Sequence, residues 1–199
     1  YTIVKGGKGL ELCQRIVDIV LSFLAMIIGI PVILIAGIFI KLEDKGPILH
    51  KQERLGKHGK EFYVYKLRSM RTDAEKFGAQ WAEKDDPRVT KVGKFIRKTR
   101  IDEIPQLFNI FKGDMGIIGP RPERPGFTKE FEETYGHFVY RLAIKPGLTG
   151  WAQVNGGYEI DPGEKLKYDI YYIKNRSLLL DIKIVFMTVK VIFTGDGAR

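Results

Sequence analysis

The chain has 199 residues, a length that fits one domain with a sizeable core. Its composition, 44% hydrophobic and 29% charged, excludes both a disordered chain and a protein with many membrane spans. The formal net charge of +9 restricts partners to anionic ones: nucleic acid, acidic lipid headgroups or phosphorylated substrates. A single cysteine, Cys13, excludes an internal disulfide, and its place beside an apolar run predicts a buried structural thiol.

A long apolar segment near the N-terminus is the first predicted element. Between Ile19 and Ile40 only Ser22 is polar. As a straight helix this segment would extend about 33 Å, enough to cross a bilayer core of roughly 30 Å. The sequence therefore predicts a membrane helix over residues 11–41, preceded by a linker over residues 1–10.

Two features favour a helix that enters the membrane, bends and returns to the same face. Pro31 lies near the middle of the segment and removes a helical hydrogen bond, at a cost of roughly 3 kcal/mol or more. Basic residues flank both ends, so the preference of Lys and Arg for the cytoplasmic side gives no clear direction. They are Lys5, Lys8 and Arg15 before the segment, and Lys41, Lys45, Lys51 and Arg54 after it. Because proline-kinked spanning helices are common, both arrangements stay open at this point.

Residues 42–199 are predicted to form one domain of mixed α/β structure that is mostly helical. Short strands are expected at residues 48–52 and 62–66, helices at residues 70–83 and 91–98, and a solvated loop at residues 85–87. A second apolar segment covers residues 178–193, where Lys183, Lys190 and Thr194 fall on one helical face. This pattern predicts an amphipathic helix lying in the membrane interface, with an ordinary packing helix as the alternative.

Residues 97–123 contain the pattern with the most chemical information. Apolar residues recur there at positions i, i+3, i+4 and i+7, namely Ile104, Leu107, Phe108 and Phe111. The spacing predicts a helix with one apolar face. Pro105 is tolerated only in a first turn, so the helix should begin near Asp102, and Gly113 is placed to cap its end.

Asp102 and Glu103 would then lie at the positive end of a helix dipole. That position favours ionised carboxylates and helps to gather phosphates or a divalent cation, although a lone acidic pair there is most often a cap.

Arg97 lies upstream of the pair and Arg121 downstream, in a turn stiffened by Pro120 and Pro122 that suits bidentate contact with a phosphate. Carboxylates between cations predict a site for a diphosphate and a metal ion, where a carboxylate attacks phosphorus or holds Mg²⁺.

Several motifs in order make the chain recognisable. They are RIDEIPQL at residues 100–107, KGDM at 112–115, GPRPE at 119–123, GP at 46–47, KLRSM at 66–70, KPGLTGW at 145–151 and QVNG at 153–156. Over roughly residues 11–194 the chain closely resembles the bacterial sugar transferases called monotopic phosphoglycosyl transferases. The resemblance implies transfer of a sugar 1-phosphate from a UDP-sugar to polyprenyl (undecaprenyl) phosphate with release of UMP, the first membrane step of glycan assembly.

The resemblance also implies roles for individual residues. Asp102 would attack the β-phosphorus to form a covalent phosphosugar intermediate, which the polyprenyl phosphate then displaces. Glu103 would assist, either with Asp102 in a Mg²⁺ site or by managing the protonation of the acceptor. The phosphate-binding residues would be Arg97, Arg121, Lys66 and Arg68, with Pro120 and Pro122 shaping the same site.

For membrane placement, the resemblance implies a re-entrant helix bent at Pro31, on the cytoplasmic face of the bacterial inner membrane. One departure from the pattern is Ile30, because small members of the family often have serine before the bending proline. Residues 1–9 resemble the linker of larger members, in which further transmembrane helices and a soluble domain precede this module. A homodimer is a reasonable expectation for that larger subclass.

Two functions of other classes compete with this interpretation. A membrane-tethered nucleic-acid-binding module would use the net positive charge, but the basic residues cluster around carboxylates and beside an apolar segment, which disfavours nucleic acid. A non-catalytic scaffold on the membrane surface is the other.

Three further features are predicted to be structural: the scattered histidines, which lack zinc-ligand spacing, Asp114, and the aromatic residues between 168 and 172. The histidines are His50, His58 and His137.

Overall fold

Helices dominate the structure, which confirms the mixed, mostly α-helical prediction. The computed structural model describes residues 4–76, 78, 86–156 and 160–194. Its elements are α1 (Lys8–Glu43), β1 (Leu49–Leu55), η1 (Lys57–Gly59), β2 (Glu61–Leu67), α2 (Lys91–Lys98), η2 (Ile101–Glu103), α3 (Gln106–Lys112), β3 (Gly116–Ile118), α4 (Pro125–Tyr135), η3 (Phe138–Ala143), β4 (Gly147–Thr149), α5 (Trp151–Gly156), α6 (Pro162–Asn175) and α7 (Leu178–Thr194). The η elements are short 3₁₀ turns.

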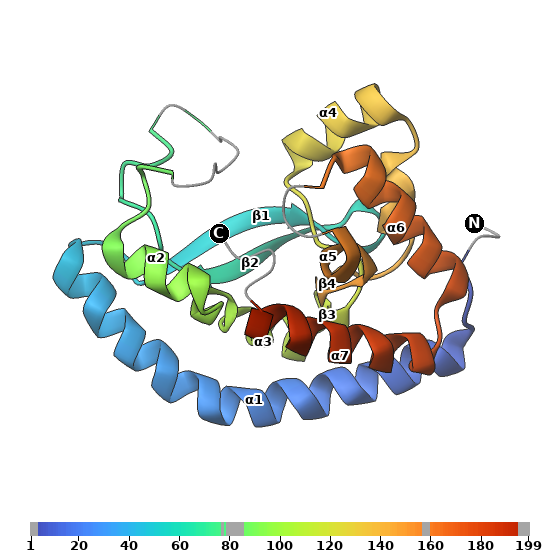
Figure 1. Ribbon diagram of the computed structural model, residues 1–199, viewed down its shortest axis with the longest axis horizontal. Coiled ribbons are helices and arrows are strands. Elements are labelled where there is room, and N and C mark those ends of the chain that lie inside the picture. The colour runs from blue at the N-terminus through green and yellow to red at the C-terminus, as the bar shows by residue number, and fades with distance from the viewer. Residues whose placement is uncertain (1–3, 77, 79–85, 157–159, 195–199) are drawn as a thin grey trace.

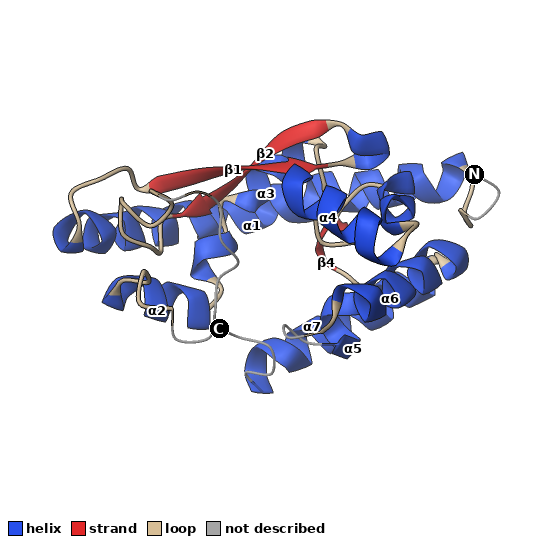
Figure 2. Cartoon of the chain, turned by 90° about the horizontal axis from the view of Figure 1, so that it is seen from above, coloured by secondary structure: helices blue, strands red, loops and turns tan. Residues whose placement is uncertain are grey.

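The strands form two small two-stranded sheets. β1 and β2 make an antiparallel hairpin in which Leu49 pairs with Leu67 and Leu55 with Glu61. β3 and β4 pair in parallel, with Gly116 opposite Gly147. The hairpin lies along one side of the molecule and α5, α6 and α7 lie on the other (Figure 2). Both predicted strands are thus confirmed, and each is longer than the sequence indicates.

Helix α1 is continuous through Pro31 and forms an arc along one side of the molecule (Figure 1). Its buried residues are Asp18, Ser22, Gly29, Ala36, Gly37 and Ile40, which lie on the side that faces the domain. Most of its large apolar side chains are exposed, up to 74% for Ile28 and 77% for Leu42. Among the described residues, α1 is the one helix whose length and composition would allow it to cross a membrane. An apolar surface of this extent indicates membrane association.

The N-terminal half of α1 is joined to the domain by two polar contacts. Arg15 donates from both terminal nitrogens to the carbonyls of Ile110 and Phe111, at 2.7 Å each, and so caps the end of α3. The buried Asp18 carboxylate accepts a hydrogen bond from the Ile117 N–H at 2.9 Å. The apolar helix therefore directly supports the helix that follows the Asp102–Glu103 pair.

The C-terminal end of α1 is joined to the same domain. The Glu43 carboxylate accepts hydrogen bonds from the N–H groups of Lys91 and Val92, at 2.8 and 2.9 Å, and so stabilises the start of α2. Asp44, the residue after the helix, pairs with Arg68 at 2.7 Å. Because both ends of α1 are bound to one domain, the arc is held in place along its whole length.

Helix α7 has one buried and one exposed face. Ile184 is fully buried with Tyr172 and Ile173, whereas Leu179 and Phe186 are 80% and 72% exposed. Lys183 and Lys190 are also exposed, while the Thr194 side chain lies outside what the structure describes. The buried face packs in the core as an ordinary helix does, and the exposed apolar residues are compatible with a location at a membrane interface.

Several local predictions prove wrong. Cys13 is exposed, because it lies on the side of α1 that faces away from the domain. Asp86 is 4% exposed and pairs with Arg88 at 2.6 Å, so it is a buried residue of an ion pair and no part of a solvated loop; Asp85 lies outside the described residues. Residues 70–76 form no helix: Met70 pairs with Val89 in a β-bridge, and residues 72–76 form turns. The rest of the helix predicted over residues 70–83, apart from residue 78, lies outside the described residues.

The capping contact of Arg15 can be tested by its effect on stability. Arg15→Ala removes two charged hydrogen bonds to carbonyls at the end of α3, and should lower the free energy of unfolding by about 1–3 kcal/mol. The measurement is the thermal unfolding midpoint of the detergent-purified chain. Lys8→Ala is the matched control, because Lys8 is an exposed basic residue of the same helix; its effect should stay within about 0.5 kcal/mol. Equal midpoints for the two variants would contradict the capping role.

Candidate active site

An open cavity of about 1200 Å³ lies between the β1–β2 hairpin and the C-terminal helices. Its walls come from residues far apart in sequence, from Pro47 to Val191. Among the described residues, ten Lys or Arg side chains and six carboxylates line it, an excess of positive charge that suits a polyanionic ligand. The lining cations are Arg54, Lys66, Arg68, Arg71, Arg97, Lys98, Arg100, Arg121, Arg124 and Lys165.

Asp102 and Glu103 lie on a 3₁₀ turn, not in the first turn of an α-helix. Helix α3 begins only at Gln106, after Pro105. Around this turn, backbone N–H groups donate to the carbonyl three residues earlier in the chain, as 3₁₀ turns do. An example is the Ile104 N–H, which donates to the Ile101 carbonyl at 3.2 Å. Proline has no N–H to continue an α-helical ladder, so the chain adopts the tighter 3₁₀ form before it. The predicted cap at Gly113 is confirmed, with φ of 100° and its N–H bonded to the carbonyls of Asn109 and Ile110.

Glu103 is surrounded by cations. Its carboxylate accepts a hydrogen bond from Arg121 and lies 3.7 Å from the Lys66 ammonium and 3.9 Å from the Arg100 guanidinium. Burial alone would raise the pKa of Glu103, but Arg121 and Lys66 outweigh it and hold this pKa well below its ordinary value. Glu103 is therefore ionised, and its negative charge is already neutralised by the protein.

Asp102 differs from its neighbour in having no such partner. It is 7% exposed and lines the cavity, yet among the described residues its carboxylate makes neither a hydrogen bond nor an ion pair. Burial raises the pKa of Asp102, and the adjacent Glu103 charge raises it further. A carboxylate that is buried, unpaired and directed at a cation-lined cavity is available to a ligand, either as a nucleophile or as a metal ligand.

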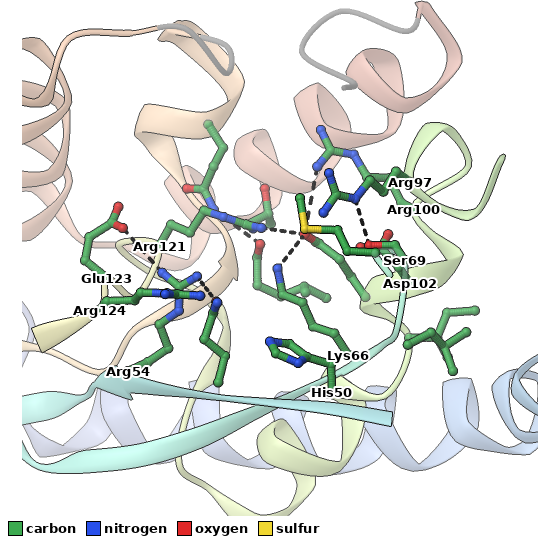
Figure 3. A pocket seen from close by; sticks show the side chains of 18 of the residues that line it. His50, Arg54, Lys66, Ser69, Arg97, Arg100, Asp102, Arg121, Glu123 and Arg124 are labelled. Carbon is green, nitrogen blue, oxygen red and sulfur yellow. Dashed lines mark hydrogen bonds and ion pairs between the residues drawn. The ribbon is translucent and has the colours of Figure 1, made fainter. Parts of the chain in front are cut away.

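Of the predicted phosphate-binding residues, Arg97 lies beside Asp102 and Lys66 lies farther along the cavity (Figure 3). Arg97 is oriented by a hydrogen bond from its Nε to the Ser69 hydroxyl at 2.8 Å. Burial lowers the pKa of Lys66, which faces Glu103. Arg68 lines the cavity as well, but two of its guanidinium nitrogens bind Asp44, so its principal contact is with the end of α1.

Pro120 and Pro122 are buried beside the cavity and do not line it. The Pro120 carbonyl accepts from the Gly147 N–H at 3.0 Å, and the Pro122 carbonyl accepts from Arg54 at 2.8 Å. These contacts fix the turn that carries Arg121. The two prolines therefore shape the site from behind, and Arg121 is the residue of this motif that reaches Glu103.

A second buried charge network, centred on Glu123, is not indicated by any pattern in the sequence. Glu123 accepts a hydrogen bond from Lys165 and lies 3.4 Å from Arg54 and 3.7 Å from Arg141. Arg141 in turn pairs with the buried Asp169 at 2.7 Å. Burial would raise the pKa of Glu123, but Lys165 and Arg141 lower it to about 2. Since the partners lie between 18 and 69 positions away in the chain, no local pattern marks them.

The residues present fit a magnesium ion that is held by a protein carboxylate together with substrate phosphates and water. Among the described residues no three His, Cys, Asp or Glu side chains form a group able to hold a metal. Mg²⁺ is commonly bound by one or two carboxylates together with substrate phosphates and water, and Asp102 offers such a ligand. Glu103 is a weaker candidate for a metal ligand, because its carboxylate is already paired with Arg121 and Lys66.

The three histidines, Asp114 and Tyr172 lie in different parts of the fold. His50 lines the cavity from β1, while His58 and His137 lie in turns elsewhere, and among the described residues none belongs to a possible metal group. Asp114 accepts a hydrogen bond from Lys112 at 3.1 Å in the turn after α3. Tyr172 is buried in the core and donates to Asp181 at 2.7 Å.

Comparison with known proteins identifies the family of this chain. The model of the family described as bacterial sugar transferase matches residues 10–195. The chain belongs to this family, as its motifs predict.

Three relatives illustrate the family. The chain is 48% identical over 189 residues to the UDP-N-acetylgalactosamine-undecaprenyl-phosphate N-acetylgalactosaminephosphotransferase of Aeromonas hydrophila, covering 94% of this chain and 45% of the relative. It is 40% identical over 193 residues to the UDP-glucose:undecaprenyl-phosphate glucose-1-phosphate transferase of Escherichia coli, covering 94% and 42%. It is 40% identical over 200 residues to the undecaprenyl-phosphate galactose phosphotransferase of Salmonella typhimurium, covering 93% and 41%. The chain thus spans less than half the length of these relatives.

The Glu123 network predicts a specific effect on acid stability. Glu123→Gln leaves buried cations without their counter-charge and should cost about 3 kcal/mol of unfolding free energy near neutral pH. Because the folded-state pKa is about 2, below the ordinary value, Glu123 contributes stability above that ordinary value, and the contribution is lost as pH falls towards 2.

The variant should therefore lose less stability than the parent chain on acidification between about pH 4 and pH 2. The measurement is unfolding by denaturant at a series of pH values. Glu133→Gln, an exposed carboxylate of α4, serves as control and should behave as the parent chain does. Parallel pH curves for Glu123→Gln and the parent chain would argue against the network.

Proposed function

We propose that the chain transfers a sugar 1-phosphate from a UDP-sugar to undecaprenyl phosphate, with release of UMP. The observation that carries this proposal is the contrast within the acidic pair: Asp102 is buried and unpaired at a cation-lined cavity, while Glu103 is neutralised by Arg121 and Lys66. Membership of the family and the names of three relatives, which specify UDP-sugars or undecaprenyl phosphate, support the same substrates.

The proposed reaction has two displacements at one phosphorus atom. In the first, a carboxylate oxygen of Asp102 attacks the β-phosphorus of the UDP-sugar. A new oxygen–phosphorus bond forms, the bond to the bridging oxygen breaks, and UMP leaves with the electron pair. In the second, an oxygen of undecaprenyl phosphate attacks the same phosphorus and the Asp102 carboxylate leaves. The acyl phosphate between the steps is reactive, so two easier displacements replace one direct transfer.

The protein stabilises charge at the transferring group. Arg97, oriented by Ser69, lies on one side of Asp102, and Arg121 approaches from the other side through its contact with Glu103. Donors fixed before the reaction stabilise the charge that develops on the transferring group without having to reorient. The role proposed for Glu103 is to orient Arg121 and Lys66. A bound Mg²⁺, with Asp102 and the substrate phosphates as ligands, would offset further negative charge.

The membrane arrangement proposed is a helix that enters and leaves on the cytoplasmic side of the inner membrane. Its support is the attachment of α1 to one domain at both ends, through Arg15 and Glu43. A spanning helix would place those ends on opposite sides of the bilayer, about 30 Å apart. The exposed apolar residues of α7 add a second point of contact with the interface.

The chemical proposal is tested by incubating the membrane-reconstituted protein with radiolabelled UDP-sugars, with and without undecaprenyl phosphate. The parent chain should become labelled by one of the donors and pass the label to the lipid. Asp102→Asn should abolish both, because an amide is a poor nucleophile; the loss should be on the order of 10³-fold or more, as for other covalent nucleophiles. Glu103→Gln should label at a reduced rate.

Asp114→Asn is the matched control, since Asp114 is a carboxylate near the end of α3 that does not line the cavity. Its labelling should match that of the parent chain. No labelled protein and no labelled lipid with any UDP-sugar would refute the transferase proposal.

The membrane arrangement is tested by cysteine labelling. Cys13 is exposed and must first be replaced by alanine. Single cysteines are then introduced as Lys5→Cys and Lys45→Cys, at exposed positions on either side of α1. A membrane-impermeant maleimide should modify both from the cytoplasmic side of inverted vesicles and neither from the outside of spheroplasts. Modification from opposite sides would show a spanning helix instead.

A further inference from the structure

The membrane helix comes within contact distance of the residue after the acidic pair at Gly29. Gly29 is buried on the face of α1 that meets α3, which lies above the middle of the arc (Figure 1). A Cβ added at this position would lie 2.7 Å from Cγ2 of Ile104 and 3.6 Å from Cδ1 of Leu107. The first distance is shorter than real carbon–carbon contacts allow. A side chain at position 29 would therefore displace Ile104, the residue that directly follows Glu103.

The turn that carries Asp102 is braced on two sides. Above, Glu103 is bound to Arg121 and Lys66. Below, Ile104 rests on Gly29. Asp102 itself has no hydrogen bond or ion pair among the described residues, so the backbone of the turn and the packing around the side chain determine where its carboxylate lies. Any change in the spacing between α1 and Ile104 is thereby transmitted to Asp102.

This spacing matters because the two substrates reach Asp102 differently. A UDP-sugar is soluble and can follow a displaced carboxylate. The phosphate of a polyprenyl lipid lies at a depth determined by the bilayer, and the exposed apolar face of α1 relates the protein to that bilayer. The distance between α1 and the Asp102 turn therefore contributes to the height of the nucleophile relative to the lipid phosphate.

We propose that Gly29 is a positioning residue that sets the height of Asp102 above the membrane for transfer to the lipid acceptor. The inference rests on the proposed function. It assigns no chemical step to Gly29, which acts only through its contact with Ile104. It predicts that enlarging position 29 impairs the second displacement more than the first.

The experiment compares the two displacements in Gly29→Ala. Labelling by the UDP-sugar without acceptor measures the first, and transfer of label to undecaprenyl phosphate measures the second. We expect labelling to fall less than about threefold and transfer to fall about 10- to 100-fold, as for a reacting group misplaced by about 1 Å. Alanine has a higher helix propensity than glycine, so α1 itself should not be weakened; the thermal midpoint of each variant checks this.

Matched second substitutions test the contact atom by atom. Ile104→Leu removes the Cγ2 methyl that a Cβ at position 29 would strike, whereas Ile104→Val keeps it. In the Ile104→Leu background, Gly29→Ala should reduce transfer by less than about threefold, and in the Ile104→Val background the larger loss should persist. Gly37→Ala is the control on the same helix face, because its Cβ would approach Ile48 at 3.1 Å, away from the acidic pair.

The outcomes separate the inference from the function on which it rests. If the parent chain forms neither labelled protein nor labelled lipid with any UDP-sugar, the proposed function fails and the inference fails with it. If the parent chain labels and transfers normally, three results would overturn the inference alone. These are unchanged transfer by Gly29→Ala, no relief of the defect by Ile104→Leu, and an equal defect in Gly37→Ala.

Discussion

The attachment of one apolar helix to the domain at both ends is the constraint on which the rest of the structure depends. Helix α1 buries a narrow face of small and polar residues and exposes the others. Through Arg15 it caps the end of α3, and through Glu43 it supports the start of α2. These two helices flank the turn that carries Asp102. A membrane-associated element thus supports the candidate active site from behind, since none of its residues lines the cavity.

The second organising feature is the difference in surroundings between two adjacent carboxylates, Asp102 and Glu103. Both residues of the pair are buried on one turn, yet three cations approach Glu103, whereas the Asp102 carboxylate has no partner among the described residues. Low dielectric surroundings make such differences large. One carboxylate is committed to holding its cations in place, and the other is left to a ligand. The proposed division of roles therefore rests on geometry and not on residue type.

Long or rigidly patterned features could be predicted from the sequence. The apolar run, the strand pair, Lys91–Lys98 and the cap at Gly113 each depend on local periodicity or on a residue with restricted backbone angles. The Glu123 network depends on contacts across 18 to 69 positions, for which one sequence contains no signal. Cys13 and Asp86 were mispredicted for the same reason, since which face of an element meets the domain is determined by tertiary packing.

The arc of α1 bears on which physical properties of a membrane the domain depends on. A spanning helix must match the thickness of the hydrocarbon layer, and mismatch sorts such proteins among bilayers. In the arrangement proposed here α1 enters and leaves on the cytoplasmic side, and its two ends are held by protein contacts at Arg15 and Glu43. The length of α1 then does not need to match the total thickness of the bilayer. The composition and lateral pressure of the cytoplasmic leaflet become the membrane properties to which this domain responds.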